Sequence, residues 1–90
     1  MNQEELYSII GFIKISPIRE ITLRSVENKI KMPSEIARET GYRTTQISAA
    51  LIKMKEKNLV VCLNKNARKG RLYTTTDYGK EILRHYKNLI

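Results

Sequence analysis

The stretch from residue 33 to residue 57, PSEIARETGYRTTQISAALIKMKEK, constrains the fold more than any other part of the chain. It predicts two short helices joined by a tight turn. Gly41 follows the first helix, where a left-handed C-cap favours glycine. Thr44 is expected to cap the second helix. Ile47, Ala50, Leu51 and Met54 repeat there at i, i+3, i+4 and i+7, which predicts one buried stripe.

The spacing of small residues indicates how these two helices cross. Ala37 supplies a small contact residue, Gly41 the turn four positions later, and Ile47 an apolar plug six positions after that. This pattern is typical of a helix-turn-helix with a steep crossing angle. A plain two-helix hairpin in an all-α domain fits the same residues. The flanking segments are therefore needed to distinguish the two folds.

The segment before the motif predicts two more helices. Residues 3–15 carry apolar side chains at helical spacing, and Gly11 weakens that helix by about 1 kcal/mol relative to alanine. Ser16-Pro17 is a helix start signal, because serine suits the N-cap and proline the first helical position. The second helix is expected to run to about Asn28 and to bury some of Ile18, Thr22, Leu23, Val26 and Ile30.

The segment after the motif predicts a β-hairpin and a last helix. Residues 59–63 and 71–75 are of strand type, and a polar, basic loop, NKNARKG, joins them into a wing spanning 59–75. Thr76 is expected to cap a helix over 76–89. Length and pattern together predict one domain, residues 1–90, that is mainly α with a small β-hairpin (α+β).

The order of these elements resembles a winged helix-turn-helix domain over about residues 16–83. Three runs carry the resemblance: PSEIARETG, LIKMKEKNLV and KGRLYTTTDYGKEIL. They look closest to small archaeal-type winged-helix transcriptional regulators and more loosely to MarR-like and ArsR-like proteins. The resemblance supports the helix-turn-helix at about 33–57. The N-terminal helix 3–15 and the C-terminal helix 76–89 are assigned to dimerisation on separate grounds, given below.

The charge is distributed as a nucleic-acid-binding protein would require. The chain carries a net charge of +8, of which residues 43–58 contribute +3 and residues 59–72 contribute +4. These are the recognition helix and the wing of the predicted motif, so double-stranded DNA is the expected partner. A winged-helix protein–protein module and a non-specific chromatin- or RNA-binding protein remain the alternatives.

The candidate DNA-binding residues lie opposite the buried stripe and in the wing. Glutamine can read adenine, arginine can read guanine, and small methyl-bearing side chains can touch the thymine methyl group. On the recognition helix the candidates are Arg43, Thr44, Thr45, Gln46, Ser48, Ala49 and Lys53. In the wing, where contact with phosphate or the minor groove is expected, they are Lys65, Arg68, Lys69 and Arg71. Ile52 lies toward the exposed side, where it could touch the wing or a partner.

The first and last helices carry apolar residues beyond those that a three-helix core can cover. We therefore expect them to form a homodimer interface. Its predicted residues are Leu6, Ile9, Ile13, Tyr78, Ile82, Tyr86 and Leu89.

Several other functions lack support in the sequence. There is no nucleophile–base pair, glycine-rich phosphate loop or carboxylate pair, so we expect no enzymatic activity. Cys62 and His85 have no companions at metal-ligand spacing, and no cofactor or small-molecule ligand is indicated. Cys62 is expected to be a buried apolar residue, with redox control the alternative. Without a signal peptide or a long apolar run, a cytoplasmic location away from membranes is expected.

Overall fold

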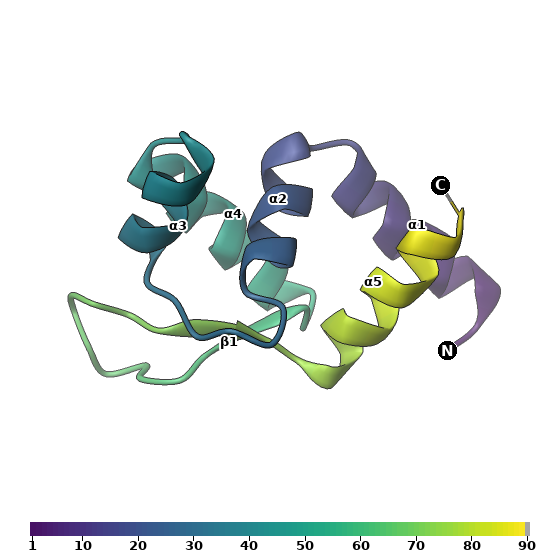
Figure 1. Cartoon of the computed structure of the whole chain (residues 1–90). Coiled ribbons are helices and arrows are strands. Elements are labelled where there is room, and N and C mark those ends of the chain that lie inside the picture. The colour runs from purple at the N-terminus through teal and green to yellow at the C-terminus, as the bar shows by residue number, and fades with distance from the viewer. Residues whose placement is uncertain (90) are drawn as a thin grey trace.

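Five helices and one β-hairpin follow one another in the predicted order within residues 1–89 (Figure 1). The computed structural model describes the backbone of these residues and the side chains as far as Asn88. None of the helices combines the length and the apolar character that a membrane span requires. The elements are α1 (Gln3–Lys14), α2 (Pro17–Ser25), α3 (Pro33–Thr40), α4 (Thr44–Glu56), β1 (Val60–Cys62), β2 (Tyr73–Thr75) and α5 (Asp77–Leu89).

The core is organised around α4, which packs against α2, α3 and β1. Its predicted stripe is the stripe that the fold buries, since Ile47, Leu51 and Met54 are all 0% exposed. Ala50 belongs to the same face at 5% exposure. The opposite side of α4 is consequently turned to solvent.

The hairpin is tied to the helical part of the chain through backbone hydrogen bonds. β1 and β2 are antiparallel, with Cys62 opposite Tyr73. Lys31, just before α3, exchanges two hydrogen bonds with Tyr73, with N–O distances of 2.9 and 3.0 Å. The Thr75 N–H donates to the Val26 carbonyl after α2 at 3.2 Å. The base of the wing is therefore fixed relative to both α2 and α3.

The chain between α2 and α3 leaves the helix earlier than predicted. α2 ends at Ser25, because Asn28 adopts a left-handed conformation with φ of 59°. Ile30 follows this turn and is 58% exposed. Thr22, Leu23 and Val26 are fully buried, so part of the predicted set of buried residues is confirmed. The two strands are also shorter than predicted, at three residues each.

Two predicted helix ends are confirmed and one is wrong. Gly41 has φ of 82°, the left-handed cap that ends α3. The Thr76 hydroxyl accepts a hydrogen bond from the Gly79 N–H at 2.9 Å and so caps α5. Thr44, in contrast, is the first residue inside α4, and the N-cap position belongs to Arg43.

The first and last helices pack against each other at the end of the molecule away from the wing (Figure 1). Four predicted dimer residues are buried there within one chain, with exposures of 8% or less: Ile9, Ile13, Ile82 and Tyr86. Leu6 and Tyr78 are half-buried against the same core, and the Leu89 side chain lies outside the described residues. The six described side chains are therefore not surplus apolar surface, so the physical reason given for a dimer in the sequence analysis is wrong for them.

Two tyrosine hydroxyls form hydrogen bonds that join α5 to α1 and α2. Tyr78 donates to Glu5 at 2.8 Å, and Tyr86 donates to Glu20 at 2.6 Å. Burial and then the bond to Glu5 raise the pKa of Tyr78 to about 12. The bond to Glu20 is the main cause of the raised pKa of Tyr86. Both groups therefore remain protonated donors at neutral pH.

Two helical glycines give a matched test of this packing. A Cβ at Gly79 would lie 2.7 Å from the Thr75 Cγ2 atom and closer still to the Leu59 carbonyl, whereas a Cβ at Gly11 would meet nothing within 4 Å. Gly79→Ala should therefore lower the free energy of unfolding by about 1–3 kcal/mol. Gly11→Ala should raise it by about 0.5–1 kcal/mol. Urea denaturation of both variants checks the signs, and a shift in the same direction would contradict this account of the contact of α5 with Leu59 and Thr75.

Candidate nucleic-acid interface

The exposed side of α4 forms a ridge between two grooves. The row opposite the buried stripe runs at i, i+4, i+7 and i+11 through Thr45, Ala49, Ile52 and Glu56, and all four residues are exposed. Ile52 is 54% exposed, which is high for a large apolar side chain. One groove separates this ridge from the wing, and the other separates it from the start of α2.

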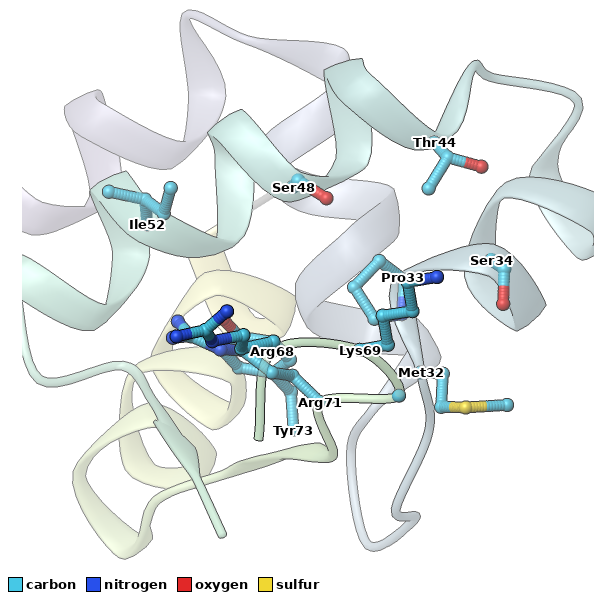
Figure 2. A pocket seen from close by; sticks show the side chains of 11 residues that line it. Met32, Pro33, Ser34, Thr44, Ser48, Ile52, Arg68, Lys69, Arg71 and Tyr73 are labelled. Atoms are coloured by element: carbon cyan, nitrogen blue, oxygen red, sulfur yellow. The ribbon is translucent and has the colours of Figure 1, made fainter. Parts of the chain in front are cut away.

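The groove on the wing side has a volume of about 450 Å³ and joins three parts of the chain. Figure 2 shows Thr44, Ser48 and Ile52 along α4, with Arg68, Lys69 and Arg71 of the wing across from them. The start of α3 closes the third side. The lining is Met32, Pro33, Ser34, Thr44, Ser48, Ile52, Arg68, Lys69, Gly70, Arg71 and Tyr73.

The wing loop holds its shape through hydrogen bonds of its own. The Asn64 side chain accepts from the Leu72 N–H at 2.7 Å and donates to the Gly70 carbonyl at 3.1 Å. Arg71 donates from Nε to the Ala67 carbonyl at 2.9 Å. A loop ordered in this way loses less conformational freedom when it binds a partner.

The cations of this face have no acidic partners among residues 1–88. The ion pairs found there join Glu20 to Arg24 within α2, Lys31 to Glu39 before and within α3, and Glu27 to Lys87 between α2 and α5. The cations of α4 and the wing take part in none of them. Their positive field is therefore not neutralised by ion pairing and is available to an anionic partner.

The groove on the other side of α4 has a volume of about 350 Å³. Its walls are the start of α2, with Ser16 and Arg19, and the α4 residues Gln46, Ala49 and Lys53. Arg19 is already engaged, since it donates to the Phe12 carbonyl at 2.9 Å and lies 4.1 Å from the centre of the Phe12 ring. Among the residues that line this groove, Lys53 is therefore the cation whose charged group is not already hydrogen-bonded within the chain.

Gln46 has a structural role that the sequence analysis did not assign. Its side-chain oxygen accepts a hydrogen bond from the Arg43 N–H at 3.0 Å and satisfies a donor at the start of α4. This is one half of a capping box, with glutamine at N3. Bidentate reading of adenine would use that same oxygen, which would then accept two hydrogen bonds, one for each lone pair. The predicted role of Gln46 in base reading stays a prediction.

The remaining predicted DNA-binding residues fall into separate groups. Thr44, Ser48, Arg68, Lys69 and Arg71 share the groove on the wing side, and Ile52, which the sequence left open, lies there beside the wing. Lys65 lines a different hollow on the far side of the wing loop. Arg43 is exposed at the tip of α4.

Sequence reasoning missed Met32 and Ser34 as part of this surface. Both belong to the start of α3, which reaches the groove because Lys31 is paired with the hairpin. Pro33 stands in the first turn of that helix, where proline is favoured. The backbone pairing of Lys31 with Tyr73, which places this helix end beside the wing, joins residues far apart in the sequence.

Cys62 is buried in β1 at 2% exposure, as predicted. Its sulfur lies 3.6 Å from the side-chain oxygen of Asn64. Among the described residues, no three His, Cys, Asp or Glu side chains gather into a group that could hold a metal ion.

Comparison with known proteins supports the fold. No family model matches the chain, and no curated protein matches it significantly. Among solved structures, a mutant of ZitR from Lactococcus lactis is similar, with a TM-score of 0.70 and 18% identity over 81% of this chain. The chain spans about half of that structure, 51%, and the likeness confirms the winged helix-turn-helix fold.

The capping hydrogen bond predicts how Gln46 variants behave. Gln46→Ala removes the acceptor at the start of α4 and should lower the free energy of unfolding by about 0.5–1 kcal/mol. Gln46→Glu keeps an oxygen at N3 and should retain the wild-type stability. Thr45→Ala is the matched control, because Thr45 is exposed on the same turn. Thermal denaturation compares the three, and an unchanged melting temperature in Gln46→Ala would show that the cap contributes nothing.

Proposed function

We propose that this chain is a sequence-specific double-stranded DNA-binding regulator of transcription. In this proposal, α4 enters the major groove and the basic wing, residues 64–71, lies on the backbone or in the minor groove. The observation that carries the proposal is the groove that sets Arg68, Lys69 and Arg71 across from the exposed side of α4. Each of these cations is exposed.

The dimensions of α4 suit this role. A helix with its side chains is about 10–12 Å across, and the major groove is about 12 Å wide. The 13 residues of α4 carry all their large buried side chains on one face, so the other face can enter the groove without exposing the core. Glu56, at the C-terminal end, would repel phosphate, which favours insertion of the part of α4 that precedes it.

The cations take different parts in the proposed complex. Lys53 lies in the groove toward α2, while Arg68 and Lys69 lie in the groove toward the wing. Phosphates of the two DNA strands flank an inserted helix on its two sides, so these cations are placed for contacts that position the protein. Arg43, at the exposed tip, is the arginine of α4 placed to reach a base edge.

We also propose that the protein acts as a homodimer, on a revised physical basis. Because Ile9, Ile13, Ile82 and Tyr86 are buried within the chain, the partner surface has to be built from exposed residues. Tyr7 and Ile15 are 54% and 79% exposed on the outer side of α1 and just after it. The longest dimension of one chain is 37 Å, which is compatible with half-sites roughly 34 Å apart.

Sedimentation at micromolar concentration tests the dimer. The wild type should sediment as a dimer, and Ile15→Lys should sediment as a monomer because it places a charge in the proposed interface. Ile30→Lys is the matched control, since Ile30 is 58% exposed near the hairpin and away from α1. A wild-type chain that stays monomeric, even on duplex DNA, would contradict the dimer.

Salt dependence tests the part played by the wing. Removing one phosphate contact should reduce the slope of log affinity against log salt by about 1 for each site. Lys69→Ala should show this reduction on any duplex. Arg84→Ala is the control, because Arg84 is exposed on α5 in a hollow with Glu27 and Asp77. Equal slopes in wild type and Lys69→Ala would show that this part of the wing does not touch DNA.

Gel-shift titration separates the proposed function from its two alternatives. Binding of one duplex at least about a thousandfold more tightly than random duplex is the expected result for specific recognition. Equal affinity for all duplexes would instead indicate a non-specific chromatin- or RNA-binding protein. No shift at low salt would remove nucleic acid as the partner and favour a protein–protein module.

A further inference from the structure

The part of α4 that faces outward carries methyl groups rather than hydrogen-bonding side chains. Thr45, Ala49 and Ile52 follow one another along the ridge, and all three are exposed. The threonine has a hydroxyl beside its methyl group, and the other two side chains are wholly apolar. No arginine, lysine, asparagine or glutamine stands on this row before Glu56.

The polar side chains of α4 lie on its flanks or are already engaged. The oxygen of Gln46 is held by the Arg43 N–H at 3.0 Å. Lys53 belongs to the groove toward α2, and Thr44 and Ser48 belong to the groove toward the wing. The surface that would face the base edges directly is therefore apolar over more than one helical turn.

Thymine is the base that such a surface can recognise. In the major groove it presents a C5-methyl group, which alanine, threonine and other apolar side chains contact. We propose that α4 selects its DNA site through the methyl groups of thymine, using Thr45, Ala49 and Ile52. This inference rests on the proposed DNA-binding function and specifies what the site on α4 reads.

The surroundings of Ile52 favour DNA over a protein as the occupant of this surface. Ile52 is 54% exposed, and Arg68, Lys69 and Arg71 stand across the same groove. Apolar protein interfaces are depleted in charge at their centre. A DNA major groove, in contrast, offers thymine methyl groups within it and phosphates along its rim, which match Ile52 and the three cations respectively.

Replacement of thymine by deoxyuridine tests the inference, because it removes the methyl group and leaves base pairing unchanged. The probe is the duplex recovered by selection from a random-sequence library with the wild-type chain. Each contacted methyl group should contribute about fourfold to affinity, so the fully substituted duplex should bind about tenfold or more weakly. Single replacements should locate the contacted thymines. Replacements outside the part of the duplex that the protein contacts should have no effect.

Two variants assign the effect to α4. Ile52→Ser should lose the preference for thymine over deoxyuridine at one position and retain it at the others. Its exposed side chain makes the variant compatible with folding, which thermal denaturation checks. Lys69→Ala should weaken binding to both duplexes equally and keep their affinity ratio, because a phosphate contact carries no sequence information.

The possible outcomes test methyl recognition separately from the proposed DNA-binding function. Enrichment of a duplex that binds equally well with thymine or deoxyuridine at every position would overturn methyl recognition and leave DNA binding intact. A site in which Ile52→Ser retains the full wild-type set of thymine preferences would also overturn it. Failure to enrich any duplex would overturn both the inference and the proposed function.

Discussion

Burial of one side of α4 is the constraint on which the rest of this structure depends. Ile47, Leu51 and Met54 are fully shielded from solvent, and each such side chain contributes about 1.5–3 kcal/mol when it is buried. To cover this stripe, α2, α3 and β1 must all pack on the same side of α4. The opposite side is then left uncovered along the length of the helix. The exposed ridge is thus a consequence of the core, and a rigid core makes it a rigid surface.

The second constraint is the attachment of the hairpin to the helices, which fixes the position of the wing relative to the exposed ridge of α4. Tyr73 is paired with both Cys62 and Lys31, so β2 lies between β1 and the chain that enters α3. Because Thr75 also bonds to the Val26 carbonyl, the hairpin cannot shift along its axis without breaking contacts to α2. The internal hydrogen bonds of Asn64 extend this order into the loop. The wing cations therefore reach the groove of α4 from an ordered support.

The sequence was sufficient for most of the fold because the signals involved are local. Helical periodicity, the glycine at Gly41 and the cap at Thr76 act within a few residues of one another, and the structure confirms all three. The failures concern relations that are not local. The repeat in α1 shows that Ile9 and Ile13 need to be buried, but it does not reveal that another helix of the same chain covers them. The groove likewise depends on the pairing of Lys31 with Tyr73, which are far apart in the sequence. A local exception is the cap of α4, where Arg43 and not its neighbour Thr44 takes the N-cap position.

The placement of the acidic residues explains why so small a domain keeps a positive face. Of the nine Asp and Glu residues, Glu20, Glu27 and Glu39 form ion pairs on the helical scaffold. Glu5 accepts from Tyr78, and Glu35 caps α3 through the Met32 N–H. These five carboxylates stabilise the scaffold, and among residues 1–88 no carboxylate forms an ion pair with a wing cation. A substitution that freed one of them would leave the wing unchanged, whereas an acid placed at Ser48 would stand directly in the groove with Arg68 and Arg71. The same separation of charge therefore serves folding on one side of the molecule and leaves an attractive field on the other.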